Sequence, residues 1–349
     1  MIQQILLNKS VIDADLVKFS GEWRQEWNGQ YTTASLDVLE SLLILLNRGG
    51  KRVRGSLAME SYYLHGGTRK EVAVGAARVI ELVQAYLLIM DDIADNSDMR
   101  RGGLSTHTYL KKLHSESGLL GDGAQYGTSQ AMNAAMLASH RAMSQLATLP
   151  APDSAKTRAA ELLNQDIGVT LVGQINDIYN EAAPHRIKRE DIINTLTWKT
   201  AYYTFVSPLE LGACLAGSDG LSQRLRQYAL NAGVAFQISD DILGTFGDSF
   251  ESGKSADDDI REGKVTLLVS HARKHASSDQ LVIINSTLGN RNATTLDCDQ
   301  LRGIFELTGA RQYAAQKAAE YAAAAVAALG HTPELFLVTL VQFAIERRS

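Results

Sequence analysis

The chain has 349 residues, of which 45% are apolar, and a formal net charge of −5. The negative charge argues against a nucleic-acid-binding protein, and the apolar content is enough for a large core. No run of about 18 uncharged apolar residues occurs, so we expect no transmembrane span. The first residues lack the pattern of a signal peptide, and Cys214 and Cys298 lack metal-ligand spacing. We therefore expect a cytoplasmic protein with free thiols.

The chain favours helices throughout, with five prolines and abundant alanine, leucine, glutamate and glutamine. Thr68 and Glu71 have the spacing of a capping box at the start of a long helix, and Pro208 is expected to kink another. Residues 102–127 and 247–256 are interpreted as loops. Helices are expected over 35–46, 69–95, 130–146, 155–179, 189–216, 221–246, 279–288, 297–329 and 333–347. Without repeats or a compositional break, the sequence predicts one all-α domain over 1–349, a bundle of about a dozen helices around a central cavity.

Three aspartates occur within five residues at the end of the apolar pattern from Val79 to Met90. A helix places Asp91 and Asp95 one above the other on one face, with Asp92 beside them. Carboxylates so close together repel one another, and a hard divalent cation such as Mg2+ relieves that repulsion. The alternative is a solvated acidic helix end, although the helix dipole disfavours aspartates at a C-terminus.

A second acidic pair follows another apolar pattern, which ends at Ile238. Asp240 and Asp241 repeat the first two positions of the earlier cluster, but Gly244 stands at the third. Two acidic clusters that each end an apolar helix pattern indicate two walls of one metal site.

Basic residues beside a pair of glycines form a candidate anion-binding stretch. Lys51 and Arg54 follow Gly49 and Gly50, and their spacing puts them on one face of a helix. Helix N-termini attract anions, and basic side chains add hydrogen-bond donors. The stretch is therefore a candidate diphosphate cradle, with a solvated basic surface as the alternative.

The order and spacing of these motifs resemble those of the trans-isoprenyl diphosphate synthases, or polyprenyl synthetases. The resemblance covers residues 49–268 and includes, besides the aspartate clusters, residues 49–54, 100–102, 173–177, 199–200, 236–237, 246–248, 253–254 and 262–264. It implies an all-helical fold, usually dimeric, around a deep pocket, so we expect a homodimer. It also implies condensation of isopentenyl diphosphate with an allylic diphosphate, assisted by Mg2+, with three ions expected in each active site.

The resemblance also implies a role for each matching residue. The expected direct Mg2+ ligands are Asp91, Asp95 and Asp240, and the residues that add to or support them are Asp92 and Asp241. The allylic diphosphate is expected to contact Arg100, Lys199 and Lys254, with Lys264 nearby. Isopentenyl diphosphate is expected to contact Lys51, Arg54 and Arg101. The residues expected to line the site are Gln84, Gln174, Thr200, Phe236 and Gln237. The released diphosphate is expected to take the proton, so no side-chain base is required.

Product length is expected to depend on the helix that carries the first cluster. Tyr86 lies five residues before Asp91, about 7 Å along the helix, with Leu87 beside it and Val83 a turn deeper. In this respect the chain resembles the short-chain members of the family that make a C20 product, in which an aromatic residue at this position forms the floor of the product pocket. We therefore expect geranylgeranyl diphosphate, with farnesyl diphosphate as the next choice; a core tyrosine with a satisfied hydroxyl is the alternative interpretation of Tyr86.

Two further functions fit the same motifs. A terpene synthase would use the first cluster to ionise a prenyl diphosphate, but it has no use for Lys51, Arg54 and Arg101. A regulatory subunit of a heteromeric synthase would tolerate the loss of motif residues, and the aspartates and lysines are intact. The chain departs from the family pattern at Gly244 and at Asn133-Ala134, where many relatives carry Gly-Asp.

Overall fold

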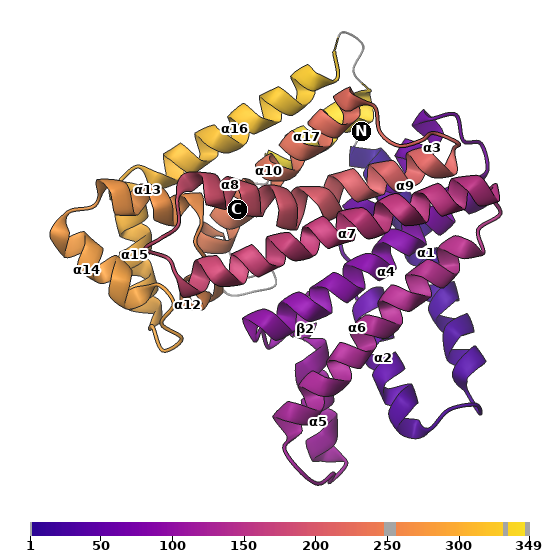
Figure 1. The fold of residues 1–349 in the computed structure, drawn as a ribbon. Helices are drawn as coiled ribbons and strands as arrows, with labels where there is room; N and C mark the ends of the chain where they lie inside the picture. The colour runs from indigo at the N-terminus through magenta and orange to yellow at the C-terminus, as the bar shows by residue number, and fades with distance from the viewer. Residues whose placement is uncertain (1, 248–255, 331–333, 346–349) are drawn as a thin grey trace. The chain divides into compact units, whose positions relative to one another are not determined.

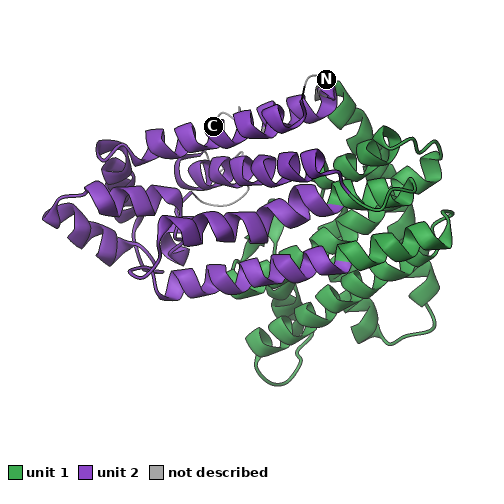
Figure 2. Ribbon diagram, turned by 45° about the horizontal axis from the view of Figure 1, so that its top comes forward, with its two compact units in different colours: residues 1–163, 208–220 green, residues 164–207, 221–349 purple. Residues whose placement is uncertain are grey.

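The structure is a computed structural model that describes residues 2–247, 256–330 and 334–345 (Figure 1). Over these residues its regular secondary structure is helical apart from one two-stranded hairpin, which confirms the predicted all-α class. The chain forms two compact units, residues 1–163 with 208–220 and residues 164–207 with 221–349 (Figure 2). The single-domain organisation stays a prediction, and each unit is described by itself.

The first unit is built around α4, a long helix that carries the first aspartate cluster at its end. It packs against α3 and α6, and its small residues Ala73, Ala76 and Ala77 are fully buried. The elements of this unit are α1 (Ile2–Trp27), α2 (Thr33–Asn47), α3 (Val53–Leu64), α4 (Lys70–Asp95), β1 (Met99–Arg100), β2 (Gly103–Leu104), α5 (Thr106–Glu116), α6 (Gly123–Ala147), and parts of α7 (Asp153–Ala182) and α9 (Ser207–Leu215).

Among the described helices, α4 is the one long and apolar enough to cross a membrane. However, 78% of its apolar window is buried inside the protein. A buried core helix passes the same test of length and composition, so this helix is weak evidence for a membrane span.

The second unit is built around α10, which packs against η1 and α16. Two glycines allow its helices to approach closely. A Cβ on Gly173 of α7 would lie 2.1 Å from the backbone nitrogen of Lys199, and one on Gly233 of α10 would lie 2.3 Å from the Cα of Ala201. The other elements of this unit are α8 (Arg189–Thr195), η1 (Leu196–Val206), α10 (Gln223–Phe246), α12 (Asp258–Glu262), α13 (Leu267–His275), α14 (Ser278–Thr287), α15 (Thr295–Leu307), α16 (Ala310–Ala328) and α17 (Leu335–Ile345).

Three local predictions were wrong. Helix α4 begins at Lys70 with Arg69 as its N-cap, and Glu71 pairs with Arg69 rather than forming a capping box with Thr68. The segment 102–127 is not a loop, because it contains β2, α5 and the start of α6. The helix predicted over 297–329 is divided into α15 and α16, since Gly309 adopts a left-handed conformation between them.

Residues 189–216 were predicted to form one helix kinked at Pro208, and the structure shows a π-helical segment within this stretch. Residues Leu196–Val206 form a π-helix, η1, which ends just before Pro208 in α9. The N–H of Ser207 donates to the carbonyl oxygen of Tyr202, five residues earlier. π-Helical turns are frequently found at functional sites, and η1 carries Lys199 and Thr200.

Candidate active site

The first aspartate cluster lies on the last turn of α4, where Asn96 ends the helix in a left-handed conformation. Asp92 is 1% exposed and Asp95 is 6% exposed. Arg100 spans the first two aspartates, because its Nε donates to Asp92 Oδ1 at 2.7 Å and its Nη2 donates to Asp91 Oδ2 at 3.1 Å. Although burial opposes its charge, attraction to these carboxylates raises the pKa of Arg100.

Arg100 and Arg101 are presented by a tight hairpin directly after the cluster. Arg100 pairs with Gly103 across β1 and β2, and the two-residue turn between them has φ of 51° at Arg101 and 71° at Gly102. Positive φ at both central residues is typical of a type I′ turn. A residue other than glycine pays about 1–3 kcal/mol for such a conformation, which is a constraint found at functional sites.

Arg101 belongs to a group of cations that the sequence predicted to bind one diphosphate, and it is partly buried, as is Arg54. Its Nη1 donates to the carbonyl oxygen of Gly49 at 2.6 Å. The two arginines beside Gln84 determine the orientation of its side-chain amide. The amide oxygen accepts from Arg54 Nη1 at 3.0 Å and from Arg101 Nη2 at 3.2 Å. The structure thus brings together Arg54, Gln84 and Arg101, while Lys51 is exposed in the loop before α3.

The electrostatics of this group favour an anion. Burial lowers the pKa of Arg101 to about 10; Glu81 opposes this shift, and the nearby cations reinforce it, namely Arg52, Arg54 and Arg100. Arg101 still remains charged at neutral pH. A bound anion would offset both the burial and the repulsion between the cations.

Arg52 supports this group and was not assigned a role from the sequence. It has a left-handed conformation with φ of 52° and is 4% exposed. Its Nε donates to Asp13 Oδ1 at 2.8 Å, its Nη1 to Glu81 Oε2 at 2.7 Å, and its Nη2 to the carbonyl oxygen of Leu46 at 2.7 Å. The charged Glu81 inside the apolar pattern of α4 was the signal that could have revealed this buried network.

In the second unit, polar side chains on η1 and α10 form a continuous chain. Thr200 Oγ1 donates to Gln237 Oε1 at 2.9 Å, and Gln237 Nε2 donates to Asp241 Oδ1 at 2.8 Å. Burial raises the pKa of Asp241 to about 7, with further contributions from the negative charges of Asp259 and Asp240. A neighbouring cation would return this carboxyl group to its charged form.

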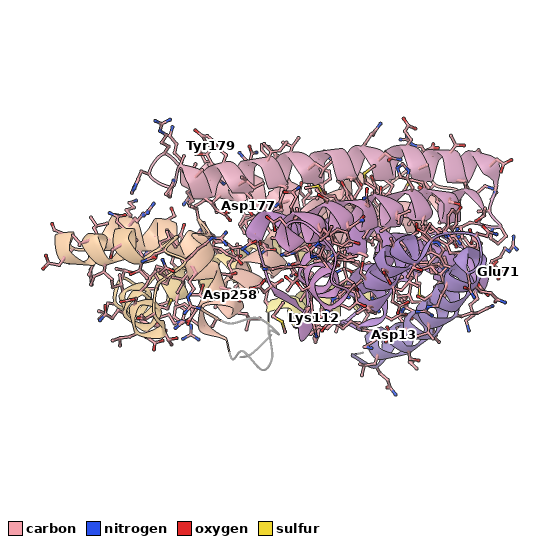
Figure 3. The ribbon with its side chains drawn as sticks, turned by 90° about the horizontal axis from the view of Figure 1, so that it is seen from below. Asp13, Glu71, Lys112, Asp177, Tyr179 and Asp258 are labelled. Carbon is pink, nitrogen blue, oxygen red and sulfur yellow. The ribbon has the colours of Figure 1, made fainter. Side chains whose placement is uncertain are left out.

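The predicted cations of the second unit lie beside carboxylates. Lys199 Nζ donates to Asp177 Oδ2 at 2.6 Å, and Figure 3 shows Asp177 on α7. Lys264 Nζ lies 3.3 Å from Asp259 Oδ1 and 3.2 Å from Glu262 Oε2. Lys254 and the loop predicted around it, except Gly247 and Ala256, lie outside the described residues.

Other predicted residues line or support the same helices. Val83 is buried on α4, Tyr86 is half-buried with its pKa raised by burial, and Leu87 is partly exposed. Phe236 is buried, and its ring meets that of Phe205 at 72° with 6.0 Å between centroids. Gln174 has a buried Nε2 atom that meets no hydrogen-bond partner within the described part of the chain. Nothing in the structure explains the departure at Asn133-Ala134, where Asn133 is exposed and Ala134 is buried.

The donor set fits Mg2+. Within the described residues, no three His, Cys, Asp or Glu side chains form a ready-made metal site. Mg2+ does not require one, since it is usually held by one or two carboxylates together with substrate phosphates. In the first unit, Asp91 and Asp95 at the end of α4 have carboxylate oxygens of this kind. In the second unit, Asp240 on α10 has one as well.

Comparison with known proteins places the chain in a family. The sequence model of the polyprenyl synthetases matches residues 37–305. The chain belongs to the polyprenyl synthetase family. This polyprenyl synthetase is 32% identical over 316 residues to the geranylgeranyl diphosphate synthase of Saccharolobus solfataricus, covering 89% of this chain and 90% of that one.

Solved structures of relatives confirm the isoprenoid synthase fold that was predicted. The geranylgeranyl pyrophosphate synthase of Corynebacterium glutamicum, solved with isoprenyl diphosphate and magnesium, has a TM-score of 0.90 and 29% identity over 98% of this polyprenyl synthetase and 99% of that chain. The polyprenyl synthase of Caulobacter crescentus, solved with calcium and isoprenyl diphosphate, has a TM-score of 0.81 and 25% identity over 100% of this chain and 98% of its own.

Proposed function

We propose that this polyprenyl synthetase condenses isopentenyl diphosphate head-to-tail with an allylic diphosphate and makes a C20, geranylgeranyl, diphosphate. The observation that carries the proposal is the arrangement at the end of α4. There, one hairpin presents Arg100 to the carboxylates of Asp91 and Asp92 and Arg101 to the cationic group with Arg54. Adjacent carboxylates and partly buried guanidinium groups suit two diphosphate substrates, one held through metal ions and one held directly.

The proposed residues each have a task in that reaction. Asp91, Asp95 and Asp240 would hold Mg2+, three ions in all, and Asp92 and Asp241 would support them. Bound Mg2+ supplies charge neutralisation for the diphosphate leaving group. Arg100, Lys199, Lys254 and Lys264 would hold the allylic diphosphate, while Lys51, Arg54, Arg101 and Gln84 would hold isopentenyl diphosphate.

The bond changes require no nucleophilic side chain. The allylic carbon–oxygen bond breaks, a carbon–carbon bond forms with isopentenyl diphosphate, and the released diphosphate takes the proton that leaves. Apolar surroundings keep water from the carbocation, and Thr200, Gln237, Phe236 and Gln174 would line this reaction centre. The buried Nε2 atom of Gln174 supports the placement, because a ligand would satisfy it.

The product is assigned to C20 on the basis of Tyr86, with Val83 and Leu87 beside it. The curated relative at 32% identity is named a geranylgeranyl diphosphate synthase, which supports the same length. We also propose that the protein acts as a homodimer and is cytoplasmic. Both statements carry forward what the sequence led us to expect.

A product assay tests this function. The purified protein receives Mg2+, isopentenyl diphosphate and one allylic primer at a time (dimethylallyl, geranyl or farnesyl diphosphate), and mass spectrometry sizes the products. A C20 diphosphate supports the proposal, whereas a C15 product would make the protein a farnesyl diphosphate synthase. A hydrocarbon formed from the allylic substrate alone would indicate a terpene synthase, and no reaction would favour a regulatory subunit. Asp240→Asn serves as the inactive control.

A further inference from the structure

The start of α12 is held by an aspartate that does not cap its own helix. Asp257 is the N-cap residue, directly before Asp258 (Figure 3), yet its side chain makes no capping hydrogen bond. It is 6% exposed, and its Oδ2 accepts from Arg261 Nη2 at 3.0 Å and from Thr295 Oγ1 at 3.1 Å. Although burial opposes the charge, hydrogen bonds from Arg302 and Thr295 lower the pKa of Asp257. Because an N-cap aspartate normally bonds the first N–H groups of its helix, this carboxylate serves tertiary contacts instead.

Arg302 of α15 joins this carboxylate to the end of α10. Its Nη2 donates to Asp257 Oδ1, and its Nε donates to the carbonyl oxygen of Thr245 at 2.7 Å. This carbonyl is one of the last four of α10, which have no partner within their own helix. The Nη1 of Arg302 donates at 2.6 Å to Asp299, whose side chain is 60% exposed on the same helix. One guanidinium fork thus connects three elements, which a lysine cannot do.

Both sides of this connection lead to residues of the proposed site. Thr245 Oγ1 donates to the carbonyl oxygen of Asp241 at 2.9 Å, so Arg302 is attached to the turn of α10 that carries the second aspartate pair. On the other side, Lys264 follows two residues after the end of α12, and its charge acts on Asp241. Because α12 has only five residues, a shift of its start at Asp257 would move Lys264 as well.

Other contacts hold α12 in the fold. The N–H of Gly289 donates to the carbonyl oxygen of Ile260 at 2.9 Å, and Arg261 Nε donates to that of Ala293 at 2.9 Å. Ile260 is 2% exposed. Loss of the Arg302 side chain is therefore expected to displace the start of α12 rather than to unfold the helix.

We propose that Arg302 is a positioning residue for the allylic diphosphate. It holds Thr245 and Asp257 together, and it thereby sets the position of Lys264 relative to the aspartate pair of α10. Arg302 acts through these two elements and not by contact with the substrate. This inference rests on the proposed function, which assigns the allylic diphosphate to Lys264.

Steady-state kinetics with each substrate varied separately tests this role. Loss of a residue that supports a metal ligand costs about 10- to 100-fold in affinity or activity. Arg302→Gln and Asp257→Asn are therefore each expected to raise the KM for farnesyl diphosphate by about that factor. The KM for isopentenyl diphosphate, which is assigned to the first unit, should stay the same. Asp299→Asn makes the same carboxylate-to-amide change at the exposed partner of Arg302 and should match the wild type.

Two further variants separate positioning from a general effect of charge. Arg302→Lys keeps the charge but cannot donate to Thr245 and Asp257 at once, so it should not restore the KM. Since Asp257 acts through Arg302, Asp257→Asn should add little to the KM in an Arg302→Gln background.

A binding measurement adds a readout without turnover. The melting temperature of the full chain is followed as inorganic diphosphate is added at a fixed Mg2+ concentration, and each variant is compared with its own value without diphosphate. Arg302→Gln is expected to require about 10- to 100-fold more diphosphate for half of the stabilisation, while Asp299→Asn should require no more than the wild type.

The outcomes distinguish this inference from the function beneath it. A lower melting temperature of Arg302→Gln with unchanged KM values and an unchanged diphosphate requirement would make Arg302 purely structural. An equal rise of both KM values, or restoration by Arg302→Lys, would also overturn the positioning role, while the synthase proposal would stand. If the wild-type protein forms no condensation product and gains no stability from diphosphate, the proposed function fails, and this inference fails with it.

Discussion

Arg52 shows how a single buried residue can organise the loop that carries two proposed substrate contacts, Lys51 and Arg54. All three nitrogens of its guanidinium group donate within the protein, to Asp13, to Glu81 and to the carbonyl oxygen of Leu46. Burial opposes its charge, but attraction to Glu81 and Asp13 outweighs that effect and raises the pKa of Arg52. The fork geometry of Arg suits such a site, and Lys cannot reproduce it. The network therefore fixes the backbone between Lys51 and Arg54.

We predict that Glu81→Ala strongly destabilises the protein. The Arg52 and Glu81 side chains are each 1% exposed, and removing one partner of a buried ion pair costs about 3–5 kcal/mol. Urea unfolding measures the loss. Glu22→Ala is the matched control, because Glu22 pairs with Lys18 at the surface at 3.7 Å and should change stability by less than about 1 kcal/mol. Equal losses in the two variants would contradict the importance of the buried pair.

Tyr86 provides a residue-scale test of product length. We predict that Tyr86→Ala yields products longer than those of the wild type, since removing the ring would deepen the proposed product pocket along α4 toward Val83. Mass spectrometry of the products measures the effect. Tyr63→Ala, the same change at an exposed tyrosine of α3, should leave product length unchanged. An unaltered product from Tyr86→Ala would remove this residue from the explanation.

At the scale of elements, Arg48 connects α2 with the hairpin that presents Arg100 and Arg101. Its Nη1 donates to the carbonyl oxygen of Arg100 at 3.0 Å and to that of Leu104 at 2.8 Å. A Cβ on Gly103 would lie 2.5 Å from Arg48 Cζ, so glycine allows the guanidinium group to lie flat against the strand. The hairpin is thus held from one side by a cation that the sequence did not single out.

We predict that Arg48→Gln raises the KM for isopentenyl diphosphate by about tenfold with a smaller effect on kcat. Hydrogen bonds to a charged group contribute about 1.5–3 kcal/mol, and their loss would loosen the position of Arg101. Steady-state kinetics with each substrate varied separately measures this, and Arg48→Lys should restore part of the affinity. Arg69→Gln, at an arginine with a side chain that is 53% exposed, is the control. A lower melting temperature with unchanged KM would indicate a purely structural role.

The hairpin is followed by α5, whose buried His107 gives a pH dependence to stability. Burial lowers the pKa of His107, so the folded protein binds this proton less readily than the unfolded chain. The neutral His107 side chain therefore makes its full contribution to the free energy of unfolding above about pH 6.5, the ordinary pKa of histidine. That contribution is lost as the pH falls below this value. We predict that the melting temperature of His107→Gln falls less between pH 8 and pH 5.5 than that of the wild type. His140→Gln, at an exposed position, should fall as much as the wild type.

The sequence predicted long, periodic elements well and short, context-dependent ones poorly. The patterns at 35–46, 155–179 and 221–246 correspond to α2, α7 and α10, because each repeats its apolar residues over several turns. Helix α5 was missed because its 11 residues include two histidines and two lysines with little apolar periodicity. Both of its histidines, His107 and His114, are buried and hydrogen-bonded to nearby residues of the chain.

At the scale of the whole molecule, the candidate site was predictable where its residues occur in compact motifs. Asp91, Asp92 and Arg100 lie within ten residues of one another and are in contact, and Thr200, Gln237 and Asp241 form one hydrogen-bonded chain. Residues that act through tertiary contacts are not marked by any motif in the sequence around them. Asp13 and Asp257 belong to this group, since only the folded structure brings them to their arginine partners.

An apolar face of α7 supports the proposed homodimer. Large apolar side chains that are exposed in the single chain recur along this helix at Leu171, Val172, Ile175, Ile178 and Tyr179, and Figure 3 labels Tyr179. Their spacing of three, four and seven residues places them on one broad face. Soluble monomers rarely leave a continuous apolar patch of this kind in water, and a second copy of the chain would cover it.

We predict that Ile175→Glu converts the proposed dimer to a monomer. Ile175 is 65% exposed in the single chain, so a charged side chain there should leave the fold of the monomer intact. In a dimer formed through this face, the same charge would be buried without a partner, which is strongly unfavourable. Light scattering after size exclusion measures the mass. Val282→Glu, at a residue of α14 with 67% exposure, introduces the same charge on another exposed apolar position and should remain dimeric. A wild-type protein that elutes as a monomer, or an Ile175→Glu variant that remains dimeric, would exclude this face of α7 as the interface.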